Sequence, residues 1–219
     1  MNTFKGYDKQ ATSDAMMRID KRERILSCVL GGAWLEKLPK HDGKNIVLFS
    51  ICEHESNKDY FDWKVKMLKE TQWLSNFKTW KKKDLYIAQW SDTRKLRIYH
   101  KWLHRSGKRT YERVLKYMYS PLFAAIMVMD RGALNQSKEL VIDLGLNYGE
   151  SADLMKVWFK DILDISTEVV RTRTMHYLSF DHLGTKKLLS SIKPIVKDIP
   201  SMYEKLYPAA HALQQDSIS

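Results

Sequence analysis

This sequence has few cysteines, fewer acidic than basic residues, and no long hydrophobic run. Its two cysteines, Cys28 and Cys52, cannot form a disulfide framework, and each lies in an apolar stretch where a buried free thiol is expected. The longest apolar runs, such as LFAAIMVM, are too short to cross a bilayer, and the first residues lack the apolar segment of a signal peptide. We therefore expect a soluble intracellular protein with no membrane partner, and the sequence leaves open whether it acts in a mitochondrion or another organelle.

The common cofactor motifs are also missing. The sequence contains no GxxxxGKS/T, no GxGxxG and no CxxC pair, which excludes a phosphate loop, a Rossmann site and a zinc ribbon. His100 and His104 have the i, i+4 spacing of two zinc ligands, but no Glu or Cys nearby completes a tetrahedral set. We expect these to be surface histidines, and we expect no metal and no cofactor.

Positive charge is abundant. The chain of 219 residues carries 37 Lys and Arg against 26 Asp and Glu, a net charge of +11 at pH 7. Its hydrophobic content of 44% is ordinary for a folded protein. A basic folded chain favours a polyanionic partner such as nucleic acid, and the alternative is a basic surface that binds nothing.

The predicted helices and strands occur in a repeated order. In the first half we predict helices at 22–35, 59–74 and 94–104, with strands at 45–53, 75–80 and 84–90. In the second half we predict helices at 121–131, 150–163 and 182–195, with strands at 139–146, 166–173 and 175–180. The repeating unit is αββαββα, and each half alone would bury its sheet incompletely. We place the repeats at 21–110 and 111–208, between an N-terminal arm (1–20) and a C-terminal tail (209–219).

The helix that opens each repeat carries small residues. The first contains Ser27 and Gly31 in ILSCVLGGAWLEK, and the second contains Ala124 and Ala125 in AAIMVMDRGAL. On a single helix these residues would reflect helix propensity or capping. Because they occur in both repeats, we expect the two helices to pack closely against each other.

Three short motifs carry a family resemblance. They are LGGAW at 30–34, VMDRG at 128–132 and IPSMYEKL at 199–206. With the repeat, they make residues 22–208 resemble the LAGLIDADG homing endonucleases, in particular the single-chain, two-motif enzymes encoded in mitochondrial introns. The resemblance implies an α+β fold in which tandem αββαββα repeats form a pseudo-twofold saddle with two antiparallel sheets. It also implies a monomer whose saddle lies in the major groove of DNA.

The resemblance implies that the last acidic residue of each motif helps to bind a divalent metal. Those two positions fall on Gly32 and Arg131, and neither side chain can ligate Mg²⁺. The residual acids are Asp130, which should point about 100° away around the helix, and Glu36, four residues beyond Gly32. We therefore assign no catalytic residue and expect an inactive endonuclease homologue.

Arg131 has two interpretations. Its guanidinium could bind phosphate and replace the charge that a metal would supply. Alternatively, it could pair with Asp130 or with a carbonyl at a helix end. Both interpretations remain open from the sequence.

Other basic residues are predicted to bind nucleic acid. A predicted hairpin turn and its equivalent in the second repeat are both basic, which suits a track for phosphates. Lys205 matches a family lysine in its motif, whereas Lys108 and Arg109 match one by position only. Alternatively, each of these basic residues is a solvated surface charge that binds no nucleic acid. The complete set is Lys78, Lys81, Lys82, Lys83, Lys108, Arg109, Arg131, Arg171, Arg173 and Lys205.

The sequence favours a nucleic-acid-binding protein derived from a LAGLIDADG homing endonuclease that has lost cleavage. We expect it to bind structured RNA, as a maturase-like intron splicing cofactor or in another RNA-organising role, because the basic segment 94–109 exceeds what one duplex face requires. One alternative is a sequence-specific DNA-binding regulator that does not cleave. Another is a DNA endonuclease that uses the displaced acids Glu36 and Asp130.

Overall fold

The computed structural model describes residues 20–39, 45–91, 94–105, 108–109, 111–145 and 149–208. The predicted arm before residue 20 and the predicted tail from residue 209 lie outside the described residues. The first half contains, in order, α2 (Lys21–Gly31), β1 (Trp34–Pro39), β2 (Asn45–His54), a short 3-10 helix (Glu55–Asn57), α3 (Lys58–Lys69), β3 (Lys78–Lys82), β4 (Leu85–Ser91), α4 (Arg94–Leu103), β5 (His104–Arg105) and β6 (Lys108–Arg109).

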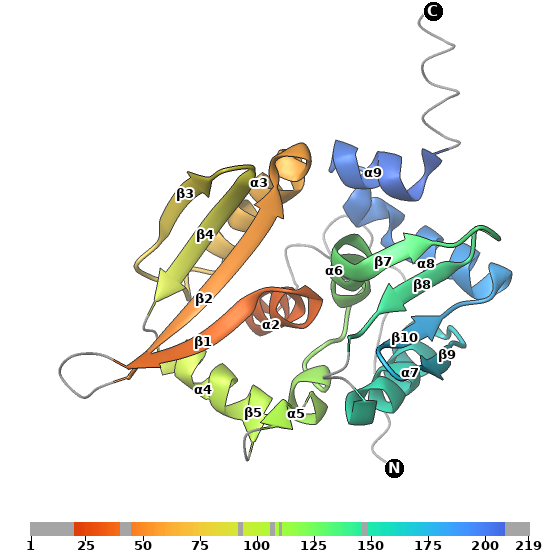
Figure 1. Cartoon of the computed structure of the whole chain (residues 1–219), viewed down its shortest axis with the longest axis horizontal. Coiled ribbons are helices and arrows are strands. Elements are labelled where there is room, and N and C mark those ends of the chain that lie inside the picture. Colours follow the sequence, from red (N-terminus) through yellow and green to blue (C-terminus); the bar gives the residue numbers. More distant parts are fainter. Residues whose placement is uncertain are drawn as a thin grey trace, which may run out of the picture.

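The second half repeats this order. It contains α5 (Glu112–Leu115), α6 (Pro121–Arg131), β7 (Gly132–Leu134), β8 (Leu140–Asp143), α7 (Gly149–Leu163), β9 (Glu168–Arg171), β10 (His176–Ser179), α8 (His182–Val196) and α9 (Pro200–Leu206). The strand orders β1-β2-β4-β3 and β7-β8-β10-β9 are equivalent, and neighbouring strands are antiparallel. Figure 1 shows the two sheets on either side of the central helices α2 and α6. The predicted α+β fold with two antiparallel sheets is confirmed.

The predicted αββαββα unit has two strands after each motif helix, but the segments placed along the sequence included only one of them and left out β1 and β7. The predicted helix 22–35 ends at Gly31, where the N–H groups of Gly32 and Ala33 both donate to the Cys28 carbonyl, at 3.0 and 2.8 Å. Strand β1 begins two residues later, after Gly32 and Ala33, and β7 begins directly after α6. No polar linker separates α2 from β1, so the hydrophobic pattern continues across that boundary and conceals it, whereas β7 has only three residues, too few to show alternation.

The side chains of the first sheet alternate between two faces. One face is buried and contacts α3 and α4; it includes Leu35, Phe49, Ile51, Ala88 and Trp90. Figure 1 shows α3 behind this sheet. The residues that alternate with the buried ones form what we call the open face, namely Trp34, Glu36, Leu48, Ser50, Cys52, Lys78, Trp80, Lys82, Leu85, Ile87 and Gln89.

The two motif helices approach closely at Gly31. A Cβ added to Gly31 would lie 2.3 Å from Oδ2 of Asp130 and 2.7 Å from Cγ2 of Ile126, both on α6. Ser27, Ala124 and Ala125 are fully buried along the two helices. The expected close packing through small residues is therefore present, and a larger residue at position 31 would force the Asp130 and Ile126 side chains to shift.

We expect Gly31→Ala to lower the free energy of unfolding by about 2 kcal/mol, because a methyl group would overpack the helix interface. Gly32→Ala is the matched control, since its added Cβ would come no nearer than 3.9 Å to Oδ2 of Asp130. Urea denaturation of both variants measures the difference. Equal stability of the two variants would contradict this packing.

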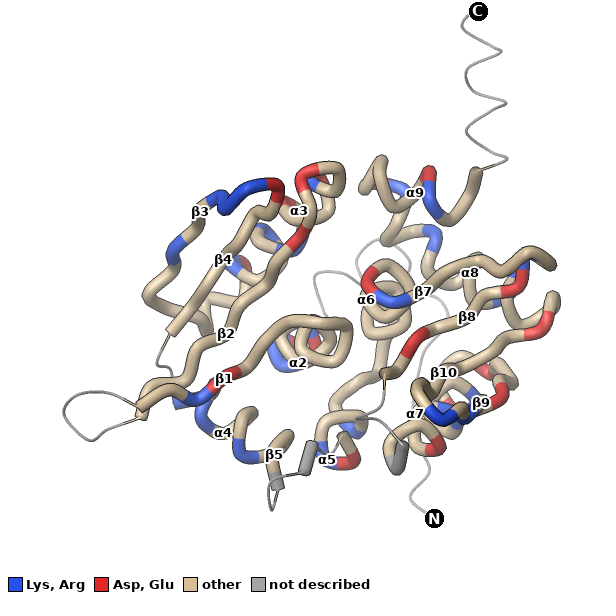
Figure 2. The backbone as a smooth tube through the Cα atoms, viewed as in Figure 1, with Lys and Arg blue, Asp and Glu red and all other residues tan. Residues whose placement is uncertain are grey.

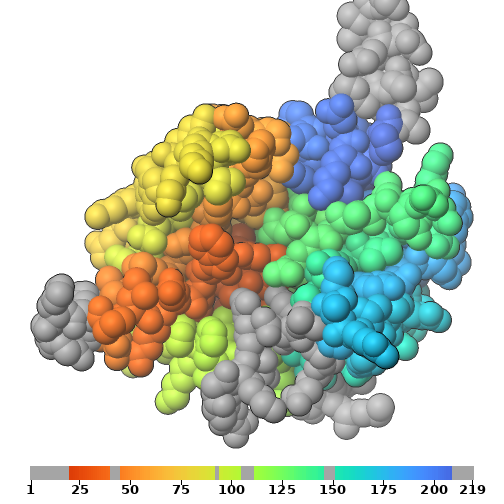
Figure 3. Space-filling model, in the orientation of Figure 1, coloured from red at the N-terminus to blue at the C-terminus, as the bar shows by residue number. Residues whose placement is uncertain are grey.

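The C-terminal helix returns to the first half. The carboxylate of Asp59, in the first turn of α3, accepts hydrogen bonds from the backbone N and Oγ of Ser201, at 2.8 and 2.6 Å. These bonds satisfy a donor at the start of α9 and tie it to α3. In Figure 3 the last described residues, in blue, lie against the orange and yellow first half. This contact fixes where α9 places Lys205.

A buried carboxylate joins α2 to the start of α6. Glu23 is 1% exposed, and its Oε1 accepts from the backbone N–H groups of Tyr119 and Ser120 and from the Ser120 hydroxyl. Burial raises the pKa of Glu23 to about 7, although the bonds from Ser120 and Tyr119 favour the ionised form. Glu23 thus links the first motif helix to the N-terminus of the second.

No helix in the described part of the chain is long and apolar enough to cross a membrane.

Candidate functional site

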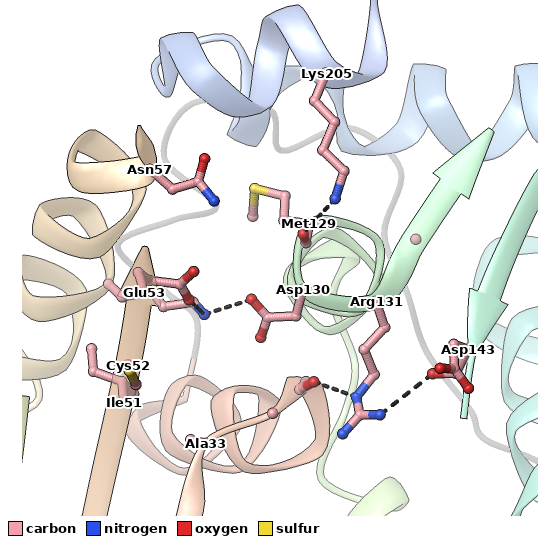
Figure 4. Close-up of a pocket in the computed structure, with 14 residues that line it drawn as sticks. Ala33, Ile51, Cys52, Glu53, Asn57, Met129, Asp130, Arg131, Asp143 and Lys205 are labelled. Atoms are coloured by element: carbon pink, nitrogen blue, oxygen red, sulfur yellow. Dashed lines mark hydrogen bonds and ion pairs between the residues drawn. The ribbon is translucent and has the colours of Figure 1, made fainter. Parts of the chain in front are cut away.

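A cavity of about 510 Å³ lies where α2 and α6 end. It is open to solvent and lined from both halves, so it occupies the centre of the pseudo-twofold arrangement. Figure 4 shows its walls, which are formed by the ends of α2 and α6, by strand β2 and by α9. The lining residues are Gly31, Gly32, Ala33, Ile51, Cys52, Glu53, Asn57, Lys64, Met129, Asp130, Arg131, Gly132, Asp143 and Lys205.

Arg131 reaches across the helix pair to the opposite motif helix. Its Nε donates to the carbonyl of Gly31, and its Nη1 lies 3.5 Å from the Asp143 carbonyl (Figure 4). A cation at the C-terminus of α2 is favourable because the last carbonyls there carry partial negative charge. Of the two partners suggested for pairing, Arg131 thus contacts the helix-end carbonyl, and Asp130 binds other groups.

Asp130 points toward α3 and β2. Its Oδ1 accepts from the Tyr60 hydroxyl at 2.7 Å and from the Lys64 ammonium at 2.5 Å. Lys64 also donates to Oε1 of Glu53 at 2.6 Å. The different directions of Asp130 and Arg131 in Figure 4 follow from the rotation of about 100° between adjacent helical residues.

The Lys64 ammonium is therefore held between two carboxylates. Lys64 is only 3% exposed, and burial alone would lower its pKa. The charges of Asp130 and Glu53 outweigh burial and hold the pKa of Lys64 above its usual value, so the ammonium stays charged. Burial raises the pKa of Glu53, against the attraction of Lys64, and burial together with Asp130 raises the pKa of Tyr60. One ammonium thus faces two carboxylates, which leaves the group with a net charge of −1 when both are ionised.

Sequence analysis missed Glu53, Tyr60 and Lys64. One signal was available, because Lys64 lies four residues after Tyr60 on the inward face of α3. A lysine on the apolar face of a predicted helix indicates a buried partner of opposite charge. The partner itself is distant in the sequence and could not be identified from it.

The residues around the cavity do not fit a divalent metal. Gly32 offers no side-chain donor atom, Arg131 is a cation, and Asp130 and Glu53 share the Lys64 ammonium. Asp143 Oδ1 accepts from the backbone N–H of Gly145 at 2.7 Å. Glu36 lies on the open face and borders a separate hollow with Trp34 and His104. Among the described residues, no group of three or more His, Cys, Asp or Glu is placed to hold a metal ion.

Lys205 also lines the cavity. Its ammonium donates to the Met129 carbonyl at 3.0 Å, near the C-terminus of α6 (Figure 4). Burial lowers the pKa of Lys205, against the attraction of Asp130 and Glu53. Arg131 and Lys205 together bring two basic side chains to the place where the two motif helices end.

The hairpin lysines do not share one face. Lys78 and Lys82 lie opposite Gln89 and Leu85 on the open face. Lys81 lies on the helix-covered side, where its ammonium is 2.5 Å from a Glu55 oxygen. Lys83 occupies the turn with a φ of 54°. Lys81 therefore does not lie on the open face with Lys78 and Lys82, because alternation along the strand turns it away.

The basic residues of the second repeat are also divided. Arg171 pairs with Asp153 of α7 at 2.5 Å, on the helix-covered side of its sheet, and Arg173 is exposed between β9 and β10. Lys108 and Arg109 form β6, and their side chains lie outside the described residues. Figure 2 shows basic residues on β3 and on α4. The positive charge is thus spread over more than one surface.

Helix α4 carries a separate basic face. Leu96, Tyr99 and Leu103 are buried, whereas Arg94, Arg97 and Lys101 are exposed. The helix contains no acidic residue. Because α4 packs on the helix-covered side of the first sheet, its exposed side chains point away from the open face.

The two histidines of this region stack on each other. The ring centroids of His100 and His104 are 4.3 Å apart, and Nδ1 of His104 lies 3.1 Å from the His100 carbonyl. Burial lowers the pKa of His100. Among the described residues, neither histidine belongs to a cluster placed to hold a metal ion.

Comparison with known proteins gives the same fold. Among solved structures, the chain resembles the homing endonuclease I-WcaI bound to its DNA recognition sequence, with a TM-score of 0.66 and 17% identity over 92% of this chain and 95% of that one. It also resembles I-DmoI in complex with DNA and Ca, with a TM-score of 0.57 and 14% identity over 81% of this chain and 89% of that one. Likenesses at such identities establish the fold alone.

Sequence comparison identifies the family. No curated protein matches the chain significantly. A family model described as the LAGLIDADG DNA endonuclease family matches residues 22–188, which is most of the chain. The match includes both motif helices and both sheets. The chain belongs to the LAGLIDADG DNA endonuclease family.

Proposed function

We propose that this protein binds structured RNA and has lost the ability to cleave DNA. The proposal rests on the two residues at the ends of the motif helices, Gly32 and Arg131. Gly32 has no side chain, and Arg131 donates to the Gly31 carbonyl. Metal-assisted cleavage of a phosphodiester needs carboxylate oxygens that hold divalent cations beside the scissile phosphate. These positions supply none.

Binding of nucleic acid is supported independently of cleavage. The family members I-WcaI and I-DmoI were solved with DNA. Here Arg131 and Lys205 reach the central cavity, and the whole chain carries a net charge of +11. Guanidinium and ammonium groups bind phosphate oxygens. We infer that the cavity retains an affinity for a phosphate backbone.

The choice of RNA rests on the basic face of α4. A duplex held against the two sheets would not touch Arg94, Arg97 and Lys101, which point away from the open face. A folded RNA has several helices and loops and can contact two surfaces of one protein. A maturase-like splicing cofactor or another RNA-organising protein fits this arrangement.

The first experiment is a binding titration of the purified protein with a folded group I intron RNA and with duplex DNA. Both titrations are run with and without Mg²⁺, and the same samples are followed for cleavage products. We expect binding of the RNA and no cleavage of either nucleic acid. Cleavage of DNA that depends on Mg²⁺ would overturn the loss of activity. Tight, sequence-specific DNA binding without RNA binding would instead support a non-cleaving DNA regulator.

The basic face of α4 gives a second test. The test is the triple variant Arg94→Gln, Arg97→Gln, Lys101→Gln. We expect it to make the slope of the logarithm of the RNA-binding constant against the logarithm of salt concentration shallower by about 2, since each phosphate contact contributes roughly 0.7 to 0.9. The matched control removes the same charge in the second half, at the exposed residues Lys138, Lys156 and Lys186. An equal change in both triple variants would mean that only net charge matters and that α4 is not the RNA surface.

A further inference from the structure

Two tryptophans are exposed on the first sheet. Trp34 is 64% exposed and Trp80 is 41% exposed, whereas Trp90 of the same sheet is 1% exposed. Each exposed indole leaves a large apolar ring in water, which is unfavourable unless a partner covers it. These two positions therefore indicate a contact surface.

The strand register places both indoles on the open face. Trp34 lies opposite Ser50, and Trp80 lies opposite Ile87. Ser50 in turn lies opposite Gln89 of β4. Gln89 and Ile87 are two residues apart on β4 and therefore point to the same side, so Trp34 and Trp80 lie on one side of the sheet. Trp34 is on one edge strand and Trp80 is on the other. Three strand spacings separate the two strands by roughly 14 Å.

The open face carries polar and basic side chains beside the tryptophans, together with the apolar Leu48, Leu85 and Ile87. The Gln89 side chain donates to Oγ of Ser50 at 3.0 Å in the middle of the sheet. Lys78 and Lys82 lie two residues on either side of Trp80, on the same face, and both are exposed. Flat aromatic rings beside ammonium groups suit nucleobases joined by phosphates better than an apolar protein surface.

A double helix cannot use these rings fully. Paired bases stack on one another, so a side chain at a groove meets base edges and not base faces. An indole stacks on a base only where that base is unpaired and accessible. The distance between the tryptophans suits a short segment of single strand that crosses the sheet from one edge to the other.

We propose that the open face binds an unpaired segment of RNA, with bases stacked on Trp34 and Trp80 and phosphates bound by Lys78 and Lys82. This proposal rests on the function proposed above and identifies the part of the RNA that the first sheet contacts. A β-sheet is a suitable platform because its strands fix both rings at a constant separation.

The test uses a fluorescently labelled oligouridylate of twelve nucleotides, followed by anisotropy and by quenching of tryptophan emission. We expect Trp34→Ala and Trp80→Ala each to weaken binding about tenfold, the effect of losing one stacked base. Trp34→Phe should recover much of the affinity because phenylalanine also stacks. Leu183→Ala is the matched control, because Leu183 is another exposed apolar residue, 71% exposed, on α8.

The outcomes separate this proposal from the proposed function. If the alanine variants bind the oligonucleotide like the unaltered protein while intron RNA still binds, the stacking proposal is wrong and the function stands. If the unaltered protein binds neither RNA, both are wrong. Sedimentation velocity gives one more contradicting outcome: self-association that Trp34→Ala abolishes would identify the open face as a contact between two copies of this chain.

Discussion

Lys64→Met is expected to lower the free energy of unfolding by about 3 to 5 kcal/mol at pH 7, the usual cost of removing one partner from a buried ion pair. The change leaves Asp130 and Glu53 close together with no cation between them. Water in the cavity would compensate this charge only in part, because the side chains of Glu53 and Asp130 are 15% and 8% exposed. Urea denaturation at pH 7 measures the loss directly.

The pH dependence identifies the cause of that loss. The raised pKa of Lys64 means that its stabilising effect is complete below the unfolded lysine pKa and is lost only at higher, alkaline pH. In the variant, Glu53 should take up a proton readily because burial already raises its pKa. We therefore expect the stability deficit to shrink as the pH falls from 7 to 5.

Lys58→Met is the matched control for the lysine variant. Lys58 pairs with Asp62 on the exposed side of the same helix, where solvent screens the pair and its loss should cost little stability. A small effect of Lys64→Met, similar to that of the control, would mean that the carboxylates do not depend on the buried ammonium.

Between about pH 4.5 and 7, Glu23 is expected to reduce stability as the pH rises. Its folded-state pKa of about 7 lies above the ordinary value of 4.5. In this interval the unfolded chain has released the Glu23 proton and the folded chain retains it, so the folded state binds more protons and loses stability with rising pH. The full contribution is about 3 kcal/mol, since one pKa unit corresponds to about 1.4 kcal/mol.

Glu23→Gln should remove this part of the pH dependence. The amide oxygen can still accept the bonds from Tyr119 and Ser120 that Oε1 accepts now. The measurement is chemical denaturation of the unaltered protein and of Glu23→Gln at pH 5 and pH 8. Glu112→Gln, which changes an exposed glutamate, is the control. If the unaltered protein and Glu23→Gln show the same difference between the two pH values, Glu23 does not titrate in this range.

Parts of the fold could be predicted from local pattern and parts could not. The amphipathic helix α3 and the strand β4 follow from hydrophobic periodicity, which each segment carries within itself. Strand β1 escaped prediction because no polar residue separates it from its helix, and β7 escaped because its three residues are too few to show alternation. The side of the sheet on which Lys81 lies depends on strand register, which a run of lysines does not reveal.

The repeat, the family and the residues at the two motif positions, Gly32 and Arg131, can be read from the amino-acid sequence, because they depend on residue type and order along the chain. The contact of Arg131 with the opposite helix, the bond between Asp130 and Lys64, and the shared face of Trp34 and Trp80 required the folded structure. Each of these is a relation between segments far apart in the chain, which packing of the motif helices and pairing of the strands bring together.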